Sequence, residues 1–169
     1  LCGADVVKIE PVAGGDQMRD RMLPSPLASV GMASPFLTLN LGKRSLALDL
    51  KHPEGKRIAL RLIANADVML HNFRAGVIDR LGLDYDAVRP VNPSIVYCTI
   101  SGFGNEGPRA RDAAFDGAIQ AASGMMANNG DKTSGPMRTG YFPVDMMTGI
   151  SAAFAIGSAL VRRERTGEG

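Results

Sequence analysis

Short stretches rich in Val, Ile and Leu alternate along this chain with longer stretches in which apolar residues recur at helical spacing. The short stretches predict strands at residues 4–10, 43–51, 67–72 and 93–104. The longer stretches predict helices at residues 52–66, 75–89 (with a break at Gly82), 115–127 and 145–165. This alternation is typical of an α/β domain with a mainly parallel sheet, in which ligands bind beyond the carboxyl ends of the strands.

The connections after the strands are therefore the places where a site is expected. Residues 11–36 contain several Pro and Gly residues and little periodicity, which predicts a long irregular loop. A loop rich in Asn, Gly and Ser is predicted at residues 128–136. The turns expected at the ligand-binding edge are residues 11–19, 72–76 and 101–109.

The composition is that of an ordinary globular protein and argues against several classes of function. The 169 residues are 45% hydrophobic and 21% charged, which suits one domain with a sizeable core. A net charge of +2 and the absence of Trp argue against a nucleic-acid partner. The 2 cysteines, Cys2 and Cys98, fit no metal-binding spacing and no disulfide framework, which favours a reducing, cytoplasmic compartment.

Both ends of the sequence read like cuts through a fold, so a fragment of a longer chain is expected. LCGADVVKIE reads like the middle of a domain and shows no signal peptide, and RRERTGEG stops without a closing element. The apolar stretch ISAAFAIGSALV (150–161) is too short to span a bilayer and is expected to form a buried helix, so no membrane association is predicted.

Two glycine- and charge-rich segments are candidate anion sites. GFGNEG (102–107) has the spacing G-x-G-x-x-G, but Pro108 follows where a phosphate-binding helix should begin. A tight turn that brings backbone close to a ligand is therefore favoured over a dinucleotide site. KIEPVAGGD (8–16) with Arg19 is either a solvated loop or the rim of a phosphate site. The basic residues around the strand at 43–51 would suit a polyphosphate: Lys43, Arg44 and Lys51.

The remaining titratable residues give weaker signals. His71 ends a predicted strand, yet a hydrogen-bonded structural histidine is the favoured interpretation. The run RRER (162–165) is expected to be a solvated helix end, with its cations favoured by the helix dipole. No Ser-His-Asp set, Cys-His pair or metal-ligand cluster stands out, so no metal site is predicted.

Asp145 is the one carboxylate in an apolar neighbourhood, within YFPVDMMTGI (141–150). Burying a carboxylate costs several kcal/mol unless it is paired or used. From the residues alone, a helix cap at Met146 is favoured over a nucleophile kept ionised by the helix dipole, but both stay open.

Several motifs together resemble the family III (CaiB/BaiF) CoA-transferases, which include formyl-CoA transferase, carnitine CoA-transferases and α-methylacyl-CoA racemase. The resemblance covers the whole chain, through segments that include GADVVKIEP, NLGKRSLALDLKHPEG, ADVMLHNFRAGVIDRLGLDYD, NPSIVYCTISGFGNEGP, FDGAIQAASGMM and DMMTGISAAFAIGSALVRRERTGEG. It implies that residues 1–169 are part of a large Rossmann-like α/β domain, with both ends truncated, from a chain that forms an interlocked homodimer.

The resemblance also implies a reaction and a set of site residues. It places Asp145 at the family's nucleophile, which attacks an acyl-CoA thioester and passes through anhydride and aspartyl-CoA intermediates to deliver CoA to a carboxylic acid. This reverses the preference for a cap. No tightly bound cofactor is implied, since CoA is a substrate. The residues that match CoA-contacting positions are Leu48, Asp49, Leu50, Lys51, Asn72, Phe73, Arg74, Arg80, Ala113, Ala114, Phe115 and Asp116.

Three departures from the family pattern bear on these expectations. Ala75 replaces a usual Pro and His71 a common Glu, and neither is expected to alter the chemistry. Phe115 stands where the racemases carry a basic His, which favours a transferase over an acyl-CoA racemase. A non-catalytic CoA-binding module, with Asp145 only a cap, is the other alternative. The acyl donor and the acceptor acid are not identified by the sequence.

Overall fold

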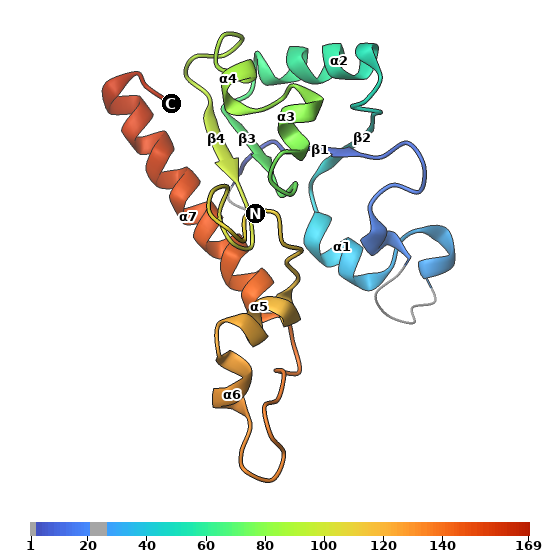
Figure 1. The fold of residues 1–169 in the computed structure, drawn as a ribbon. Helices are drawn as coiled ribbons and strands as arrows, with labels where there is room; N and C mark the ends of the chain where they lie inside the picture. The colour runs from blue at the N-terminus through green and yellow to red at the C-terminus, as the bar shows by residue number, and fades with distance from the viewer. Residues whose placement is uncertain (1–2, 21–26) are drawn as a thin grey trace. The chain divides into compact units, whose positions relative to one another are not determined.

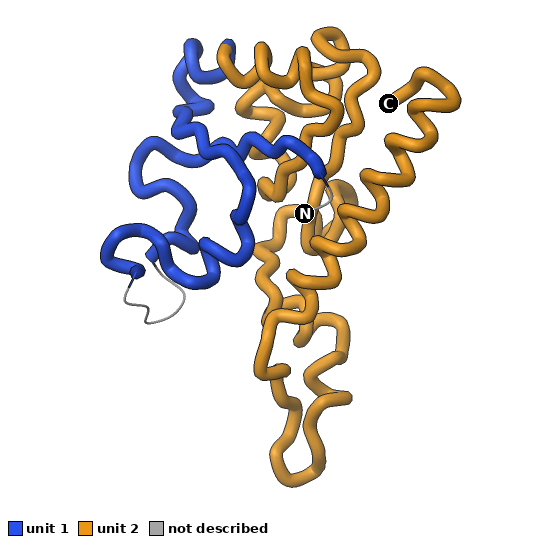
Figure 2. Tube along the Cα trace, turned by 180° about the vertical axis from the view of Figure 1, so that it is seen from behind, with its two compact units in different colours: residues 1–57 blue, residues 58–169 orange. Residues whose placement is uncertain are grey.

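The computed structural model describes residues 3–20 and 27–169 and divides into two units, residues 1–57 and 58–169 (Figure 2). Each unit holds one pair of parallel strands, so the predicted α/β class is confirmed. The strands of the described residues form two separate two-stranded pairs. That residues 1–169 belong to one large domain stays a prediction.

The first unit is built on two parallel strands that are shorter than predicted, β1 (Val7–Glu10) and β2 (Arg44–Ala47). The predicted loop at 11–36 is interrupted by two 3-10 helices, Gln17–Arg19 and Ala28–Val30. A further helix, α1 (Ser34–Asn40), starts at the end of this loop. The sequence did not predict α1, because its 7 residues are too few for a helical period to show.

Charged side chains of segment 8–19 pair with one another inside the first unit. Glu10 is buried and accepts hydrogen bonds from Nε (2.8 Å) and Nη2 (2.9 Å) of Arg19. The hydrogen bond from Arg19 is the main reason that the pKa of Glu10 is lowered to about 2. Lys8 pairs with Asp16, and the Arg19 guanidinium lies 3.9 Å from the ring centroid of Phe36. These charges satisfy each other, which does not support a phosphate rim made from them.

The helix predicted at 52–66 is α2 (Pro53–Ile63), and the division between the two units falls within it. Its end is capped inside the second unit by Asn92, whose Nδ2 donates to the carbonyl oxygens of Ile63 (2.9 Å) and Ala66 (2.8 Å). These bonds tie the last residue of α2 and the segment that follows it to Asn92. The buried apolar core of the second unit consists of Ala59, Ile63, Ile78, Leu83, Val88, Ile95 and Val96.

The second unit has a parallel strand pair, β3 (Val68–His71) and β4 (Val96–Thr99), with His71 opposite Thr99. Between these strands the chain forms α3 (Val77–Leu81) and α4 (Tyr85–Val88). The predicted break between the two helical pieces is confirmed at Gly82, which has a positive φ of 63°. The carboxyl ends of β3 and β4 therefore lie side by side, as the sequence pattern indicated.

The single helix predicted at 115–127 is instead two helices, α5 (Asp116–Ala122) and α6 (Met125–Asn129). Gly124 separates them, because its φ of 81° is not a helical value and is one that glycine adopts without strain. α6 and the loop after it project away from β3 and β4 (Figures 1 and 2).

The last helix, α7 (Pro143–Thr166), runs beside β4 (Figure 1). Its Arg163 donates to the carbonyl oxygens of Asp67 (3.3 Å) and Ser94 (3.4 Å) and, at 2.8 Å, to the Asp67 carboxylate. The expectation that the run 162–165 is a solvated helix end is therefore wrong for Arg163. This side chain ties the end of α7 to the segments that lead into β3 and β4.

The expectation that residues 150–161 form a buried helix is also wrong for the described part of the chain. α7 has no buried residue, and its apolar side chains are exposed: Met146, Met147, Ile150, Phe154 and Val161. By length and composition α7 is one helix that could cross a membrane. A single such helix is weak support for a membrane span, because helices that pack inside larger proteins pass the same test.

Candidate active site

The start of α7 is held by a carboxylate from another helix. Phe142 precedes the helix and makes no side-chain capping bond, and Pro143 occupies its first turn. The backbone N–H groups of Val144 (2.9 Å) and Asp145 (3.1 Å) both donate to Oδ2 of Asp116, at the start of α5. Asp116 thus supplies from a distance in sequence the acceptor that an ordinary N-cap residue supplies locally.

Asp116 is held in turn by Gln120, one turn further along α5. Nε2 of Gln120 donates to Oδ1 of Asp116 at 2.5 Å, and Oε1 of Gln120 accepts from the backbone N–H of Thr139 at 3.0 Å. Both side chains are buried, with exposed fractions of 4% for Asp116 and 0% for Gln120. The two residues form one closed network that fixes segment 139–145. We call this network the α5 clamp.

Asp145 is the third residue of α7 and faces outward from this clamp. Its side chain is exposed, and among the residues that the structure describes its carboxylate has no hydrogen-bond or ion-pair partner. The interpretation of Asp145 as a helix cap is therefore wrong, because Asp116 accepts the helix amides. Partial burial, and secondly the negative charge of Asp116, raise the pKa of Asp145.

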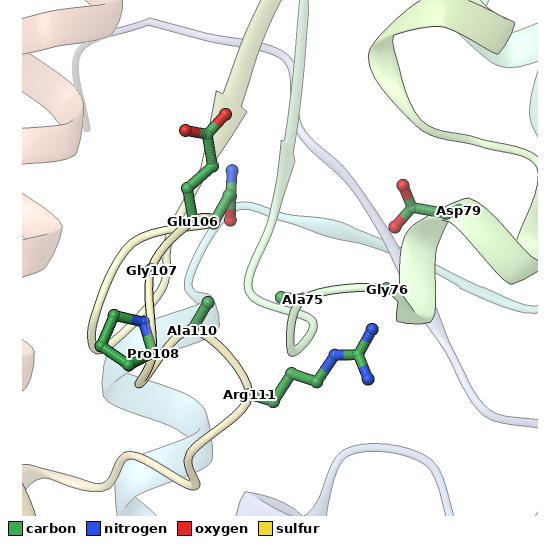
Figure 3. Close-up of a pocket in the computed structure, with 9 residues that line it drawn as sticks. Ala75, Gly76, Asp79, Glu106, Gly107, Pro108, Ala110 and Arg111 are labelled. Carbon is green, nitrogen blue, oxygen red and sulfur yellow. The ribbon is translucent and has the colours of Figure 1, made fainter.

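A polar cavity of about 500 Å³ opens at the carboxyl ends of β3 and β4. It contains the predicted CoA-binding residues Phe73 and Arg74, together with the aromatic rings of Tyr85 and Tyr97. A smaller cavity of about 300 Å³ lies between the turn at Ala75–Gly76 and the loop around Gly107 (Figure 3). The carboxylates that line these cavities are Asp79, Asp84, Asp86 and Glu106.

Three arginines lie around these cavities. Arg74 lines the larger cavity, and Arg111 lines the smaller one and extends toward the turn at Ala75–Gly76 in Figure 3. Arg80 lies beside the same turn, since a Cβ on Gly76 would sit 3.5 Å from its Nη1. Within the described part of the chain, none of these guanidinium groups makes an ion pair with a carboxylate. Unpaired cations beside a polar cavity suit an anionic ligand such as a polyphosphate.

Residues 113–116, a predicted CoA-binding stretch, differ in how far they are exposed. A Cβ on Gly102 would lie 2.0 Å from Cβ of Ala114, so the glycine turn after β4 packs directly on this stretch. Ala113 is exposed, and Phe115 is 68% exposed. Asp116 is buried, and its carboxylate accepts from the backbone amides at the start of α7, so a role of this residue in CoA binding stays a prediction. Within this stretch, Ala113 and Phe115 are the two residues that the structure leaves accessible.

The remaining predicted stretch, Leu48 to Lys51, lies in the first unit after β2. Oδ1 of Asp49 accepts from the backbone N–H of Lys51 at 2.9 Å. A Cβ on Gly55 would lie 1.9 Å from the carbonyl oxygen of Asp49, so only glycine lets α2 approach this turn so closely. Nearby, Arg44 is paired with Asp5 at 2.6 Å, which leaves Lys43 and Lys51 as the basic residues of this strand without a carboxylate partner among the described residues.

The glycine motif after β4 is a turn and not a dinucleotide-binding loop. Gly104 and Gly107 have φ values of 84° and 93°, and no helix begins until Asp116. A dinucleotide site needs a helix directly after the glycines, to bring its amides to the phosphates. Separately, no group of three His, Cys, Asp or Glu side chains suited to a metal is found in the residues that the structure describes.

Two side chains of the site were missed by the sequence reasoning. Gln120 lies four residues after Asp116 on a predicted helix, and this spacing places both on one face, so the pairing had a detectable signal. Arg111 lies in an irregular loop with no periodicity, and only its place beside the turn at Ala75–Gly76 distinguishes it.

A sequence model of CoA-transferase family III matches residues 2–169, and the chain belongs to this family. The α/β fold described above matches the solved structure of a member of this family.

Curated relatives and solved structures agree with this assignment. A succinate–glutarate CoA-transferase of Agrobacterium fabrum is 41% identical over 170 residues, covering 99% of this chain and 42% of the relative. An acetyl-CoA:oxalate CoA-transferase of Acetobacter aceti is 40% identical, with coverages of 99% and 42%. The crystal structure of a CaiB/BaiF family protein from Brucella suis matches with a TM-score of 0.89 and 39% identity, covering 99% of this chain and 44% of that one. The chain thus spans under half the length of these relatives.

Proposed function

We propose that the protein containing this chain transfers CoA from an acyl-CoA thioester to a carboxylic acid, with Asp145 as the nucleophile. The observation that carries the proposal is the Asp145 carboxylate. It is exposed and unpaired among the described residues, its own backbone N–H is fixed by the α5 clamp, and its pKa is raised. A carboxylate that is held in place but unpaired is suited to attack a carbonyl carbon. The names of the relatives, all CoA-transferases, support the same reaction class.

The proposed reaction conserves the thioester bond through two exchanges. A carboxylate oxygen of Asp145 attacks the thioester carbonyl, the C–S bond breaks, and CoA leaves as the thiolate. The thiolate then attacks the Asp145 carbonyl of the mixed anhydride, which releases the donor acid and leaves an aspartyl-CoA thioester. The acceptor acid repeats the two steps in reverse order, so the products are a new acyl-CoA and free Asp145. No net proton is consumed.

The cavities at the ends of β3 and β4 are proposed to hold part of CoA. Asn72, Phe73 and Arg74 form the turn, and Arg80 supplies a further cation beside it. The stretch Leu48–Lys51 is proposed to contribute from the first unit, through Lys51 and the backbone that Gly55 supports. Ala113, Ala114, Phe115 and Asp116 are proposed to border the pantetheine. No tightly bound cofactor is proposed, because CoA itself is the substrate.

The surroundings of the reaction are also proposals. The partners are an acyl-CoA and a carboxylic acid, and the relatives' names make succinate, glutarate, oxalate, formate and acetate the acids to test first. An interlocked homodimer in the cytoplasm is proposed for the whole protein.

The test is chemical trapping in the full-length protein. It is incubated with acetyl-, succinyl- and formyl-CoA, quenched with hydroxylamine, and digested for mass spectrometry. A hydroxamate at Asp145 is expected, and Asp145→Asn is expected to reduce transfer roughly thousandfold or more. Full activity of Asp145→Asn, or α-proton exchange into deuterated water without a hydroxamate, would overturn the proposal.

A further inference from the structure

His71 is buried at the carboxyl end of β3, immediately before the turn Asn72–Arg74. It is 8% exposed. Its ring packs against Phe73 at a centroid distance of 5.7 Å and edge-on against Tyr97 at 5.5 Å. The proposed chemistry does not use this imidazole, although it lines the same cavity as Phe73 and Arg74.

The hydrogen bonds of His71 require its neutral form. Nδ1 accepts from the backbone N–H of Phe73 at 3.3 Å, so Nδ1 carries no proton. Nε2 therefore carries the proton of the neutral ring and donates to Oγ1 of Thr99 at 3.1 Å. The bond to Phe73 spans two residues, in the same way that an Asn or Asp side chain closes a turn on the residue two positions later. His71 thus acts as the acceptor that shapes the turn.

Protonation would remove this acceptor. Both nitrogens of an imidazolium are donors, so Nδ1–H and the Phe73 N–H would face each other without an acceptor between them. The Phe73 amide would have to move or lose its bond, and the turn that it belongs to would move with it. Thr99 would keep its bond, because its hydroxyl accepts in either state.

We propose that neutral His71 positions the turn Asn72–Arg74 for CoA, so that protonation of His71 weakens CoA binding. The inference rests on the proposed function, because it assigns this turn to CoA. His71 is a positioning residue: it acts on CoA through the Phe73 backbone.

Burial and a nearby charge shift the pKa of His71 in opposite directions. Burial lowers the pKa of His71, and the negative charge of Asp79 on α3 opposes this shift. From β4, Tyr97 faces the ring with a pKa raised to about 12, so it is uncharged, and its hydroxyl donates to the Leu83 carbonyl oxygen at 2.8 Å. The other charged groups that line the cavity are Arg74, Asp84, Asp86 and Glu106. Because burial is the larger effect, the imidazole is neutral at neutral pH and titrates below its ordinary range near pH 6.5.

The experiment measures the Kd for CoA of the full-length protein by calorimetry between about pH 8 and about pH 5, where an exposed histidine changes charge. Wild type is compared with His71→Asn, whose amide oxygen accepts the Phe73 N–H in an Asx turn and does not titrate. The wild-type Kd is expected to rise about fivefold more than that of His71→Asn, the effect of one lost hydrogen bond. CoA's own phosphate titration is common to both proteins and cancels in the comparison.

Two further variants separate positioning from general stability. His52 is the other histidine of this chain, is exposed, and accepts from the Glu54 N–H at 3.2 Å. His52→Asn should keep the wild-type pH profile. His71→Glu supplies an acceptor in either protonation state, because a protonated carboxyl keeps an acceptor oxygen, so its profile should lose the acid rise in Kd. It also serves if His71→Asn does not fold. In turnover at low pH, KM for acyl-CoA should rise more in wild type than in His71→Asn, while kcat changes equally in both proteins.

The outcomes distinguish the inference from the function on which it rests. Equal pH profiles for wild type, His71→Asn and His71→Glu, with CoA bound by all, would overturn the positioning role and leave the proposed function intact. Failure of wild type to bind CoA at any pH would overturn both. The proposal would be supported if the Kd for CoA rises more steeply at low pH in wild type and in His52→Asn than in either His71 variant.

Discussion

The carboxylates of Asp116 and Asp145 both lie at the start of α7, but their environments differ and suit them to different roles. Asp116 is buried, accepts two backbone amides and one side-chain amide, and holds the chain in place. Asp145 is exposed and without a partner among the described residues, and its pKa is raised by partial burial and by Asp116. The carboxylate with three hydrogen bonds is therefore the structural one, and its unpaired neighbour is the proposed nucleophile.

The raised pKa of Asp145 predicts an acid limit to activity. Only the ionised carboxylate attacks, so kcat/KM should fall as pH drops through the pKa of Asp145 in the free protein. Because that pKa is raised from the ordinary 3.8, the fall should begin at a higher pH than for an exposed aspartate. A profile of kcat/KM against pH in the full-length protein checks this. A fall in kcat/KM that is centred at or below the ordinary pKa of aspartate would contradict the prediction.

The α5 clamp predicts a compensating pair of substitutions. Asp116→Asn places an NH₂ group against Nε2 of Gln120, two donors face each other, and stability should fall by about 1–3 kcal/mol. Adding Gln120→Glu restores an acceptor for both the new amide at position 116 and the Thr139 N–H, so the double variant should regain most of this loss. Urea unfolding of the two single variants and the double variant measures the coupling. Additive losses would show that the clamp is not one network.

Helices in which apolar residues recur over several turns were predictable from the sequence. Short helices, and a break that depends on one backbone angle, were not. α2 and α7 carry Pro in their first turns and repeat apolar residues over several turns, which makes them visible. α1 and α6 are only 7 and 5 residues long, and the break at Gly124 depends on a backbone angle that composition does not reveal. The parallel strands and the break at Gly82 were predictable because the alternation of strands with helices, and a glycine that interrupts a helix, are visible in a short stretch of sequence.

The contacts that hold the candidate site were not predictable from the sequence. The motif resemblance placed Asp145 and the turn Asn72–Arg74. It also placed Asp116 in a CoA-contacting stretch, and it gave no sign that the Asp116 carboxylate accepts from the amides of α7. That contact joins residues 28 and 29 positions apart, and a sequence gives no direct signal for a cap supplied by another helix.

The turn before α2 predicts a sharp difference between two glycines. Gly55→Ala would place a Cβ 1.9 Å from the Asp49 carbonyl oxygen, which is backbone and cannot swing aside, so the turn at residues 48–51 must shift. Lower stability and a weaker affinity for CoA are expected. Gly157→Ala in the interior of α7 meets nothing within 4 Å of this chain's own atoms and gains helix propensity, so a loss of stability in the full-length protein would show that another surface covers this side of α7. Thermal unfolding of both variants, with calorimetry for CoA, makes the comparison.

At the scale of the whole molecule, the exposed apolar side of α7 predicts how residues 1–169 behave alone. Met146, Ile150 and Phe154 are 60%, 61% and 77% exposed, and a contiguous apolar surface of this kind is normally covered. Residues 1–169 expressed alone are expected to be poorly folded or inactive, to bind a hydrophobic dye and to self-associate, whereas the full-length protein should not bind the dye or aggregate. Size-exclusion chromatography with dye fluorescence tests both. A monodisperse fragment that binds CoA tightly would contradict the expectation.

The closeness of Asp116 and Asp145 has a further effect during the proposed cycle. In the resting protein both carboxylates are negative and repel each other, which is part of the reason for the raised pKa of Asp145. Once Asp145 is acylated, as anhydride or as thioester, it no longer carries the charge that Asp116 repels. Each covalent intermediate therefore relieves a repulsion that the empty protein carries. Asp116, which holds the start of α7 in place, thus favours the acylated form of Asp145 over its free carboxylate.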